Sequence, residues 1–163
     1  MISLTRAVFS RAETDELYEI CRSQPAYWRL SGDADPGTMT RDSVEAMLRA
    51  DAAADGCETL VARDGTGRVV GFVQLLLRHP VSGRPWIGLL MVDGRLGRRG
   101  YGRDIVAAVE ERFRSGGAAA VELGVLVANE AARSFWERLG YRAIDVRPDR
   151  DKGRPTAVLE KPL

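Results

Sequence analysis

Apolar residues recur along the chain with two spacings, one near two residues and one near 3.6 residues. The shorter spacing predicts strands over residues 2–9, 58–63, 68–78, 86–92, 121–127, 141–147 and 155–161. The longer spacing predicts helices over residues 10–22, from Thr40 onward, over 102–115 and over 129–139, with a loop over 31–37. The order of these elements indicates a mixed α/β fold, in which helices flank a central sheet.

The length of 163 residues suits one domain spanning residues 1–163. Basic and acidic residues nearly balance, with a formal net charge of +1, which speaks against broad nucleic-acid binding. The longest uncharged apolar stretch is about ten residues, whereas a membrane span needs about 20. Because the N-terminus becomes acidic where a signal peptide would be apolar, we expect a cytoplasmic protein.

Cysteine and histidine, the residue types typical of zinc sites, are scarce. Cys21 and Cys57 are isolated, and His79 is the only histidine, so we expect no zinc or other metal site. The only lysines are Lys152 and Lys161, which leaves no candidate for the lysine of a Walker A phosphate loop.

A loop rich in glycine and arginine joins the strand predicted over 86–92 to the helix predicted over 102–115. Glycine lets a ligand approach the backbone, and the free N–H groups of the first helical turn suit a phosphate or pyrophosphate. Four arginines add positive charge there: Arg95, Arg98, Arg99 and Arg103. The alternative is a solvated loop that binds nothing. A Rossmann loop is disfavoured, because its third glycine would fall at Ile105.

A second block covers residues 125–141, from the end of one strand through the next helix. Asn129 follows the strand and can either cap the helix or hydrogen-bond a bound amide, and capping is the default interpretation. Phe135 and Trp136 are also compatible with plain core positions.

Together the two blocks resemble the signatures of the GNAT superfamily of acetyl-CoA-dependent N-acetyltransferases. The first signature, Gln/Arg-x-x-Gly-x-Gly/Ala at a helix start, is matched by residues 97–102, GRRGYG. The second, Asn-x-x-Ala-x-x-Phe/Leu-Tyr-x-x-x-Gly-Phe, is matched by Asn129, Ala132, Phe135, Trp136, Gly140 and Tyr141. The order of elements also matches the family over nearly the whole chain.

The resemblance implies a mostly antiparallel sheet of six to seven strands, splayed between the fourth and fifth strands and flanked by about four helices. Acetyl-CoA would lie in the splay, with its pantetheine arm paired to backbone groups near Met91 and Val92. Its pyrophosphate would contact Arg98, Arg99, Gly100, Tyr101, Gly102 and Arg103. Asn129 and Trp136 would complete the cofactor site. A primary amine of a small molecule, peptide or protein would attack the thioester directly.

The sequence departs from the family pattern at catalytic positions. Trp136 stands where many members have a tyrosine that protonates the departing thiolate, and an indole N–H has no accessible proton to give. Gly97 replaces the usual Gln or Arg, which should weaken binding little. The strand over 86–92 lacks the glutamate that some members use as general base. The remaining candidates for the base are His79, Glu122 and Asp93, with a chain of water molecules favoured over all three.

The family's acceptor pocket implies four acceptor-binding residues here: Tyr27, Trp28, Asp33 and Asp35. The two aspartates would hold a cationic amine, over which Trp28 would pack by a cation–π contact. The alternative is a polar loop beside a tryptophan that anchors the core. A second function also stays open, a non-catalytic module that senses acyl-CoA. We expect an amine acceptor as partner and no nucleic acid or membrane, and a homodimer is compatible with the sequence.

Overall fold

One mixed sheet runs through the computed structural model, which describes residues 1–163. Its strands are β1 (Ser3–Arg6), β2 (Cys57–Arg63), β3 (Val69–Leu76), β4 (Trp86–Val92), β5 (Ala120–Leu126), β6 (Arg142–Pro148) and β7 (Pro155–Pro162). They lie in the order β1-β2-β3-β4-β5-β7-β6. The predicted mixed α/β class is confirmed.

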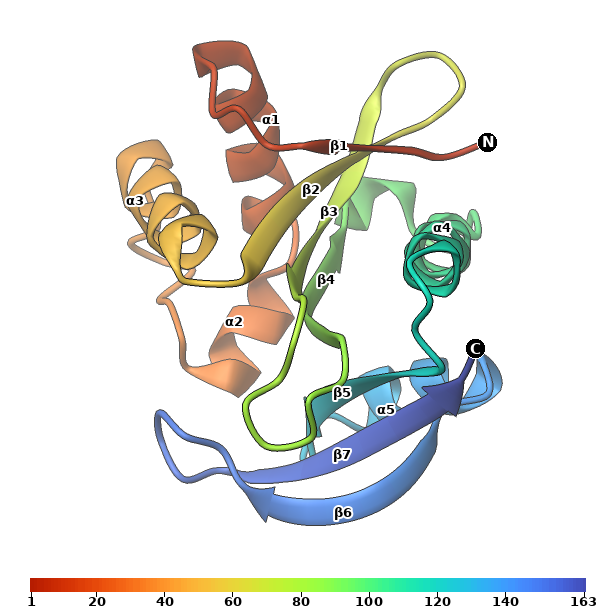
Figure 1. Cartoon of the computed structure of the whole chain (residues 1–163). Helices are drawn as coiled ribbons and strands as arrows, with labels where there is room; N and C mark the ends of the chain where they lie inside the picture. Colours follow the sequence, from red (N-terminus) through yellow and green to blue (C-terminus); the bar gives the residue numbers. More distant parts are fainter.

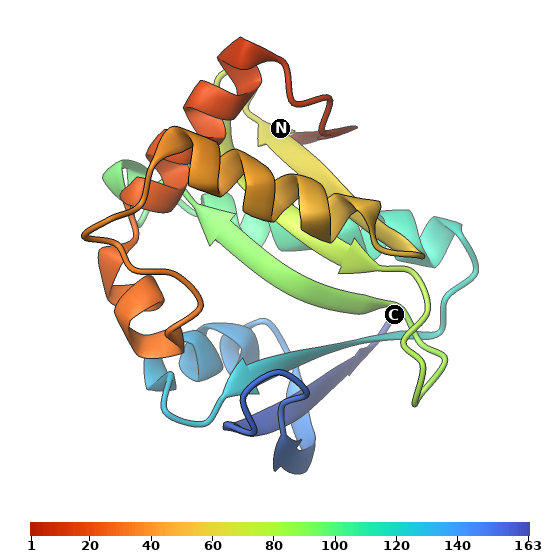
Figure 2. The ribbon, with the colours of Figure 1, turned by 90° about the vertical axis from the view of Figure 1, so that its left-hand side faces the viewer.

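Five α-helices flank this sheet: α1 (Arg11–Arg22), α2 (Pro25–Ser31), α3 (Arg41–Ala53), α4 (Tyr101–Ser115) and α5 (Glu130–Arg138). Helices α1 to α3 cover one face, and α4 and α5 cover the other (Figures 1 and 2). A short 3₁₀ turn, Gly94–Leu96, connects β4 with α4. The chain contains no helix with the length and apolar character that a membrane crossing requires.

The sequence pattern predicts about four helices and misses α2, which has only seven residues. Pro25 lies in its first turn, where the fixed φ of proline suits a helix start. Gly32 ends the helix with a φ of 69°. So short a helix cannot display the periodicity that reveals longer ones.

The first strand ends earlier than predicted, at Arg6 rather than at Phe9. Phe9 has a φ of 53°, which takes the chain out of the strand conformation. The Glu13 carboxylate accepts hydrogen bonds from the N–H groups of Val8 and Phe9, each at 2.7 Å. The predicted cap is present, since Ser10 accepts from the Glu13 N–H. The chain therefore turns directly from β1 into α1.

The sheet opens between β4 and β5, as expected. These are its only parallel neighbours, and they pair only at Trp86 with Glu122 and at Ile87 with Leu123. Figure 2 shows the two strands diverging from there. On its other edge, β4 pairs with β3 through a register shift that leaves Gly88 as an extra residue. Such a bulge bends the strand and increases its local twist, which favours the opening.

A separate hydrophobic core lies on each face of the sheet. The larger joins the sheet to α4 and α5, and Ile105 and Val109 are fully buried in it. The smaller joins the sheet to α1, α2 and α3, with Leu17, Trp28 and Leu48 at its centre. Because α2 and α5 are anchored in different cores on opposite faces, each can wall one side of the opening between β4 and β5.

Candidate functional site

The start of α4 presents a row of backbone N–H groups. Gly100 is the N-cap residue, with a φ of 82° and no side-chain hydrogen bond to the helix. The N–H groups of Tyr101, Gly102 and Arg103 therefore have no partner within the helix. Arg98 also has a positive φ, 64°, so the chain curls around the helix end. We call the N–H groups from Arg98 to Arg103 the amide cradle, and this arrangement suits an anion.

The amide cradle opens onto a cavity of about 530 Å³, here called the loop cavity. Its basic lining residues are Arg98, Arg99, Arg103 and Arg138. Arg103 pairs only with its neighbour Asp104, at 3.1 Å, and the other three form no ion pair within the protein. The loop cavity therefore carries an excess of positive charge that suits a ligand with several phosphate groups.

Three residues around the loop cavity were not predicted from the sequence. Arg138 lies three residues after Phe135, which lines the same cavity, so helical spacing was an available signal. The Gln24 side chain donates from Nε2 to the Val92 carbonyl at 2.8 Å. The Ser23 hydroxyl accepts from the Gly94 N–H at 2.8 Å. These last two contacts join the turn between α1 and α2 to the end of β4 and the 3₁₀ turn after it. No local sequence pattern predicts them.

Asp93 holds the loop in place and is a poor general base. Its side chain is 1% exposed, and its carboxylate accepts from the Arg95 backbone N–H and from the Arg95 guanidinium at 2.8 to 3.0 Å. Burial pushes the pKa of Asp93 up, but the hydrogen bonds and charge of Arg95 outweigh it and hold the pKa below its ordinary value. A general base works best with a pKa near the operating pH, and this carboxylate is far from that.

A second, mostly apolar cavity of about 480 Å³ adjoins the loop cavity and is called the middle cavity. The two share Gln24, Val92, Gly102 and Phe135. Its floor is the edge of β4 beside the opening, and its walls come from α2 and α5. This shape suits an extended chain lying along an open strand edge.

The edge of β4 offers backbone groups from alternate residues, which corrects the expectation for Met91. The Asp93 N–H bonds to the Val70 carbonyl, and Met91 lies opposite Phe72 two residues earlier. By the alternation of an antiparallel ladder, Met91 turns its backbone toward β3, and Leu90 and Val92 turn theirs toward the opening. The Met91 side chain is 3% exposed, belongs to the smaller core and lines the middle cavity. Leu90 therefore replaces Met91 beside Val92 as a candidate for backbone pairing with a ligand.

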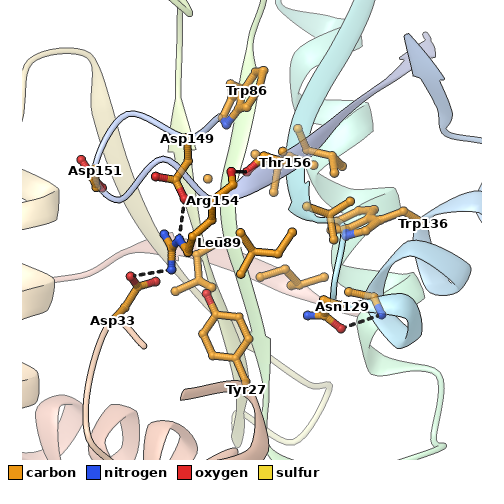
Figure 3. Close-up of a pocket in the computed structure, with 18 residues that line it drawn as sticks. Tyr27, Asp33, Trp86, Leu89, Asn129, Trp136, Asp149, Asp151, Arg154 and Thr156 are labelled. Carbon is orange, nitrogen blue, oxygen red and sulfur yellow. Dashed lines mark hydrogen bonds and ion pairs between the residues drawn. The ribbon is translucent and has the colours of Figure 1, made fainter. Parts of the chain in front are cut away.

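A third cavity of about 410 Å³ passes between β4 and β5 and is called the gap cavity (Figure 3). It meets the middle cavity at five shared residues, which we call the junction: Tyr27, Leu90, Asn129, Ala132 and Trp136. Its far end carries charged side chains, Asp33, Asp149, Asp151 and Arg154, with Trp86 on the strand side. The three cavities thus form one continuous path from the amide cradle through the sheet.

A latch of charged residues lines the far end of the gap cavity. Arg154 donates to the Ser31 carbonyl and the Asp149 carboxylate, and it lies 3.1 Å from Asp33 (Figure 3). Lys152 donates to the Gly32 carbonyl. These contacts tie the hairpin between β6 and β7 to the segment after α2. Backbone hydrogen bonds from Lys152 and the guanidinium of Arg154 lower the pKa of Asp149 to about 2, so Asp149 stays ionised at neutral pH.

Asn129 and Trp136, both expected at the cofactor, lie in the wall shared by the middle and gap cavities. The Asn129 side-chain oxygen accepts from the Ala132 N–H at 3.1 Å and caps α5, so its NH₂ group is left for other contacts. Trp136 is 7% exposed and packs edge-on against Phe135 and Tyr141. The capping role and a place at the cavity wall are therefore compatible.

The four residues expected around the acceptor separate in space. Tyr27 and Asp33 line the gap cavity. Trp28 is 2% exposed, belongs to the smaller core and donates from Nε1 to the Cys21 carbonyl at 2.8 Å, so it cannot pack over an amine. Asp35 lines a neighbouring cavity of about 320 Å³, which Asp33 also lines, and accepts the Gly37 N–H. The core interpretation of Trp28 thus replaces the acceptor-binding one.

His79 and Glu122 lie beside the gap cavity without lining any of the three cavities. His79 stacks on Trp86, with ring centroids 4.2 Å apart, in the hairpin between β3 and β4. Burial and the nearby Arg147 and Arg150 lower the pKa of His79. Glu122 is 3% exposed and lies 3.5 Å from Arg84. Neither side chain reaches the junction.

Replacing His79 with phenylalanine is expected to change kcat/KM by less than about twofold, since this variant keeps a ring stacked on Trp86. The measurement is the pH profile of acetyl transfer for both proteins. A loss of about tenfold or more, together with a flattened acidic limb, would identify His79 as the general base instead.

The sequence matches the model of the acetyltransferase (GNAT) family over residues 14–141. No curated protein matches it. Among solved structures, an acetyltransferase from Thermus thermophilus has a similar fold, with a TM-score of 0.76, 21% identity and coverage of 100% of this chain and 97% of the other.

Two further structures are similar in fold. A ribosomal-protein-S18-alanine N-acetyltransferase from Escherichia coli has a TM-score of 0.65 and 16% identity, covering 99% of this chain and 94% of its own. An aminoglycoside 6'-N-acetyltransferase complexed with coenzyme A has a TM-score of 0.68 and 18% identity, and the match covers 98% of this chain and 96% of the other. The family match spans most of the chain and includes the amide cradle, both strands that border the opening and most of the cavity lining. The chain therefore belongs to the acetyltransferase (GNAT) family.

Proposed function

We propose that this protein transfers an acetyl group from acetyl-CoA to a primary amine by direct attack. The observation that carries the proposal is the continuous path of three cavities, which begins at a helix start with unpaired N–H groups and crosses the opening in the sheet. The amide cradle and its arginines would hold the diphosphate. The edge of β4 at Leu90 and Val92 would pair with the pantetheine arm, as an added strand does. The thioester would then reach the junction.

The gap cavity would admit the amine from the side opposite the cofactor. No cysteine, serine or histidine lines the junction, and both Cys21 and Cys57 lie outside the three cavities. An acyl-enzyme intermediate would need such a nucleophile, so direct attack is the simpler route. The carboxylates of Asp33 and Asp149 are engaged by Arg154, and Asp151 lies at the far end of the gap cavity rather than at the junction. Water would therefore take the proton that the amine loses.

The acceptor is proposed to be a small molecule or a flexible peptide end, because the gap cavity holds about 410 Å³. Solved structures with this fold include enzymes named for an aminoglycoside and for the alanine of a ribosomal protein, so the fold serves both classes. In this chain the acidic side chains at the far end of the gap cavity favour an acceptor with a positive charge beside the reacting amine.

The proposal is tested by titrating coenzyme A in a calorimeter and by measuring thiol release from acetyl-CoA with polyamines, aminoglycosides, amino acids and peptides. We expect saturable binding and turnover with at least one of these classes. Absence of heat with well-folded protein would contradict the cradle assignment. Tight binding without turnover on any class would instead favour the acyl-CoA-sensing module.

A further inference from the structure

The junction between the middle and gap cavities is where the reacting atoms would meet. This inference rests on the proposed function, which places the acyl donor in the middle cavity and the amine in the gap cavity. Acetyl transfer breaks the bond between the carbonyl carbon and sulfur, and the electron pair goes to sulfur. A negative charge therefore develops at the junction, away from the arginines of the loop cavity, and a hydrogen-bond donor there would stabilise it.

The donors available at the junction are few. Leu90 and Ala132 have apolar side chains, and the Ala132 N–H is already bound to the Asn129 side chain. The Trp136 indole is 7% exposed and held between two aromatic rings. Three side-chain donors therefore line the junction: the Asn129 NH₂ group, the Trp136 indole N–H and the Tyr27 hydroxyl, which is the only hydroxyl among the five residues. An O–H group is also the donor type that forms the shortest hydrogen bonds to anions.

Tyr27 is held firmly in its place on α2. Its ring packs edge-on against Trp28 with centroids 5.0 Å apart, and Trp28 is anchored by its hydrogen bond to the Cys21 carbonyl. Figure 3 shows the side chain pointing from α2 into the gap cavity. Because the rigid core fixes the ring, its hydroxyl would need little reorganisation during the reaction.

We propose that the Tyr27 hydroxyl donates a hydrogen bond to the sulfur of the departing coenzyme A. The amine nitrogen forms its bond to the acetyl carbon, the carbon–sulfur bond breaks, and the thiolate is held by Tyr27 as it forms. The proton that leaves the nitrogen passes to water, and a proton from water converts the thiolate to the thiol. Tyr27 keeps its own proton throughout.

The proton stays on Tyr27 because its environment makes it a weaker acid than the thiol. Burial and the charge of Asp33 raise the pKa of Tyr27 to about 12. An ordinary thiol has a pKa of about 8.5. Tyr27 thus remains a neutral donor across the working pH range, and its role is electrostatic.

The kinetic test is Tyr27→Phe, which keeps the ring and removes the hydroxyl. We expect the single-turnover rate of acetyl transfer to fall about 10- to 100-fold, the range for a lost hydrogen bond to a charged group, with KM for both substrates within about twofold. Tyr18→Phe is the matched control, because its hydroxyl contacts only the Met39 carbonyl, and its rate should not change. An unchanged rate in Tyr27→Phe, or a raised KM for the amine alone, would overturn the inference.

The second test does not depend on turnover. The thiol pKa of bound coenzyme A is measured from thiolate ultraviolet absorbance, with desulfo-coenzyme A as the reference ligand. We expect this pKa to be about one unit lower on the unaltered protein than on Tyr27→Phe. Equal values in the two proteins would overturn the inference alone. Failure of the unaltered protein to bind coenzyme A would overturn the proposed function and this inference with it.

Discussion

Replacing Gly100 with valine is expected to weaken coenzyme A binding by about 100-fold or more, equivalent to roughly two lost hydrogen bonds to a charged group. Gly100 has a φ of 82°, which a β-branched residue resists strongly. The backbone would shift toward negative φ, and the N–H groups of Tyr101, Gly102 and Arg103 would no longer converge. An added Cβ would lie 3.4 Å from the mobile end of Arg103, so internal clash is a minor part of the effect.

Calorimetric titration of coenzyme A measures this loss, and Gly117→Val provides the matched control. Gly117 follows the opposite end of α4 with a φ of 86°, and an added Cβ there meets nothing within 4 Å. Both variants should lose similar stability through backbone strain. Only Gly100→Val should lose binding. Equal loss of affinity in both would mean that the amide cradle is not the phosphate site.

The part of the site that the sequence reveals is the part built from contiguous residues. The amide cradle depends on backbone groups within residues 97–103, so the glycine pattern predicts it directly. The cap at Asn129 is equally local, since its partner is three residues away. Helix starts and glycine turns act over one turn of chain, and a linear pattern records them.

The latch and α2 could not be predicted in this way. Arg154 meets Ser31 and Asp33 across more than 120 residues of chain. Gln24 meets Val92 across 68 residues. Such contacts depend on how the sheet opens and on where α2 packs. The sequence around a charged residue in a hairpin does not indicate which distant residue it will contact. The charged end of the gap cavity therefore needed the structure, whereas the amide cradle did not.

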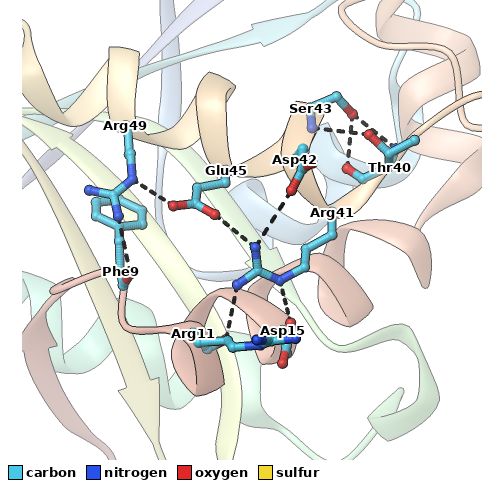
Figure 4. A network of polar contacts seen from close by, with 9 residues as sticks. All are labelled: Phe9, Arg11, Asp15, Thr40, Arg41, Asp42, Ser43, Glu45 and Arg49. Carbon is cyan, nitrogen blue, oxygen red and sulfur yellow. Dashed lines mark hydrogen bonds and ion pairs between the residues drawn. The ribbon is translucent and has the colours of Figure 1, made fainter.

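Helix α3 shows the same difference between predictable local contacts and unpredictable long-range contacts within one element. Its start at Thr40 is predicted, and the structure has a reciprocal cap between Thr40 and Ser43 (Figure 4). Its attachment to α1 is a network around Arg41, which contacts Asp15 on α1 and Glu45 on its own helix. Ion pairs that are largely accessible to solvent each contribute about 1 kcal/mol or less. The network therefore orients α3 more than it stabilises the fold.

The expectation that the Met91 backbone faces the opening was wrong for a different reason. The pattern over residues 86–92 correctly predicts a strand, but a strand's backbone groups face its two neighbours in alternation. Which residue faces which neighbour depends on the register with β3, and apolar residues on both faces leave that register unmarked. Leu90 and Val92, not Met91, thus face the opening.

Removing the carboxylate of Asp93 is expected to have the second large effect, a loss of stability. Asp93→Ala should lower the free energy of unfolding by about 2–4 kcal/mol, because a cap and hydrogen bonds to a charged partner are lost together. That corresponds to a drop in Tm of about 5–15 °C for a chain of this size. Urea denaturation at neutral pH gives the difference directly. Coenzyme A affinity should fall as well, since the turn that Asp93 caps leads into the amide cradle.

Asp93→Asn separates the charge from the cap, because the amide oxygen still accepts the Arg95 N–H. The folded pKa of Asp93 lies below its unfolded value, so its charge stabilises the fold fully above about pH 4. This contribution disappears as the pH falls through the lower folded pKa, and the unaltered protein and Asp93→Asn should converge in stability there. Asp104→Ala, at an exposed partner of Arg103, is the control and should cost less than about 1 kcal/mol. If Asp93→Ala were as mild as this control, the loop after β4 would owe its shape to its glycines rather than to the buried carboxylate.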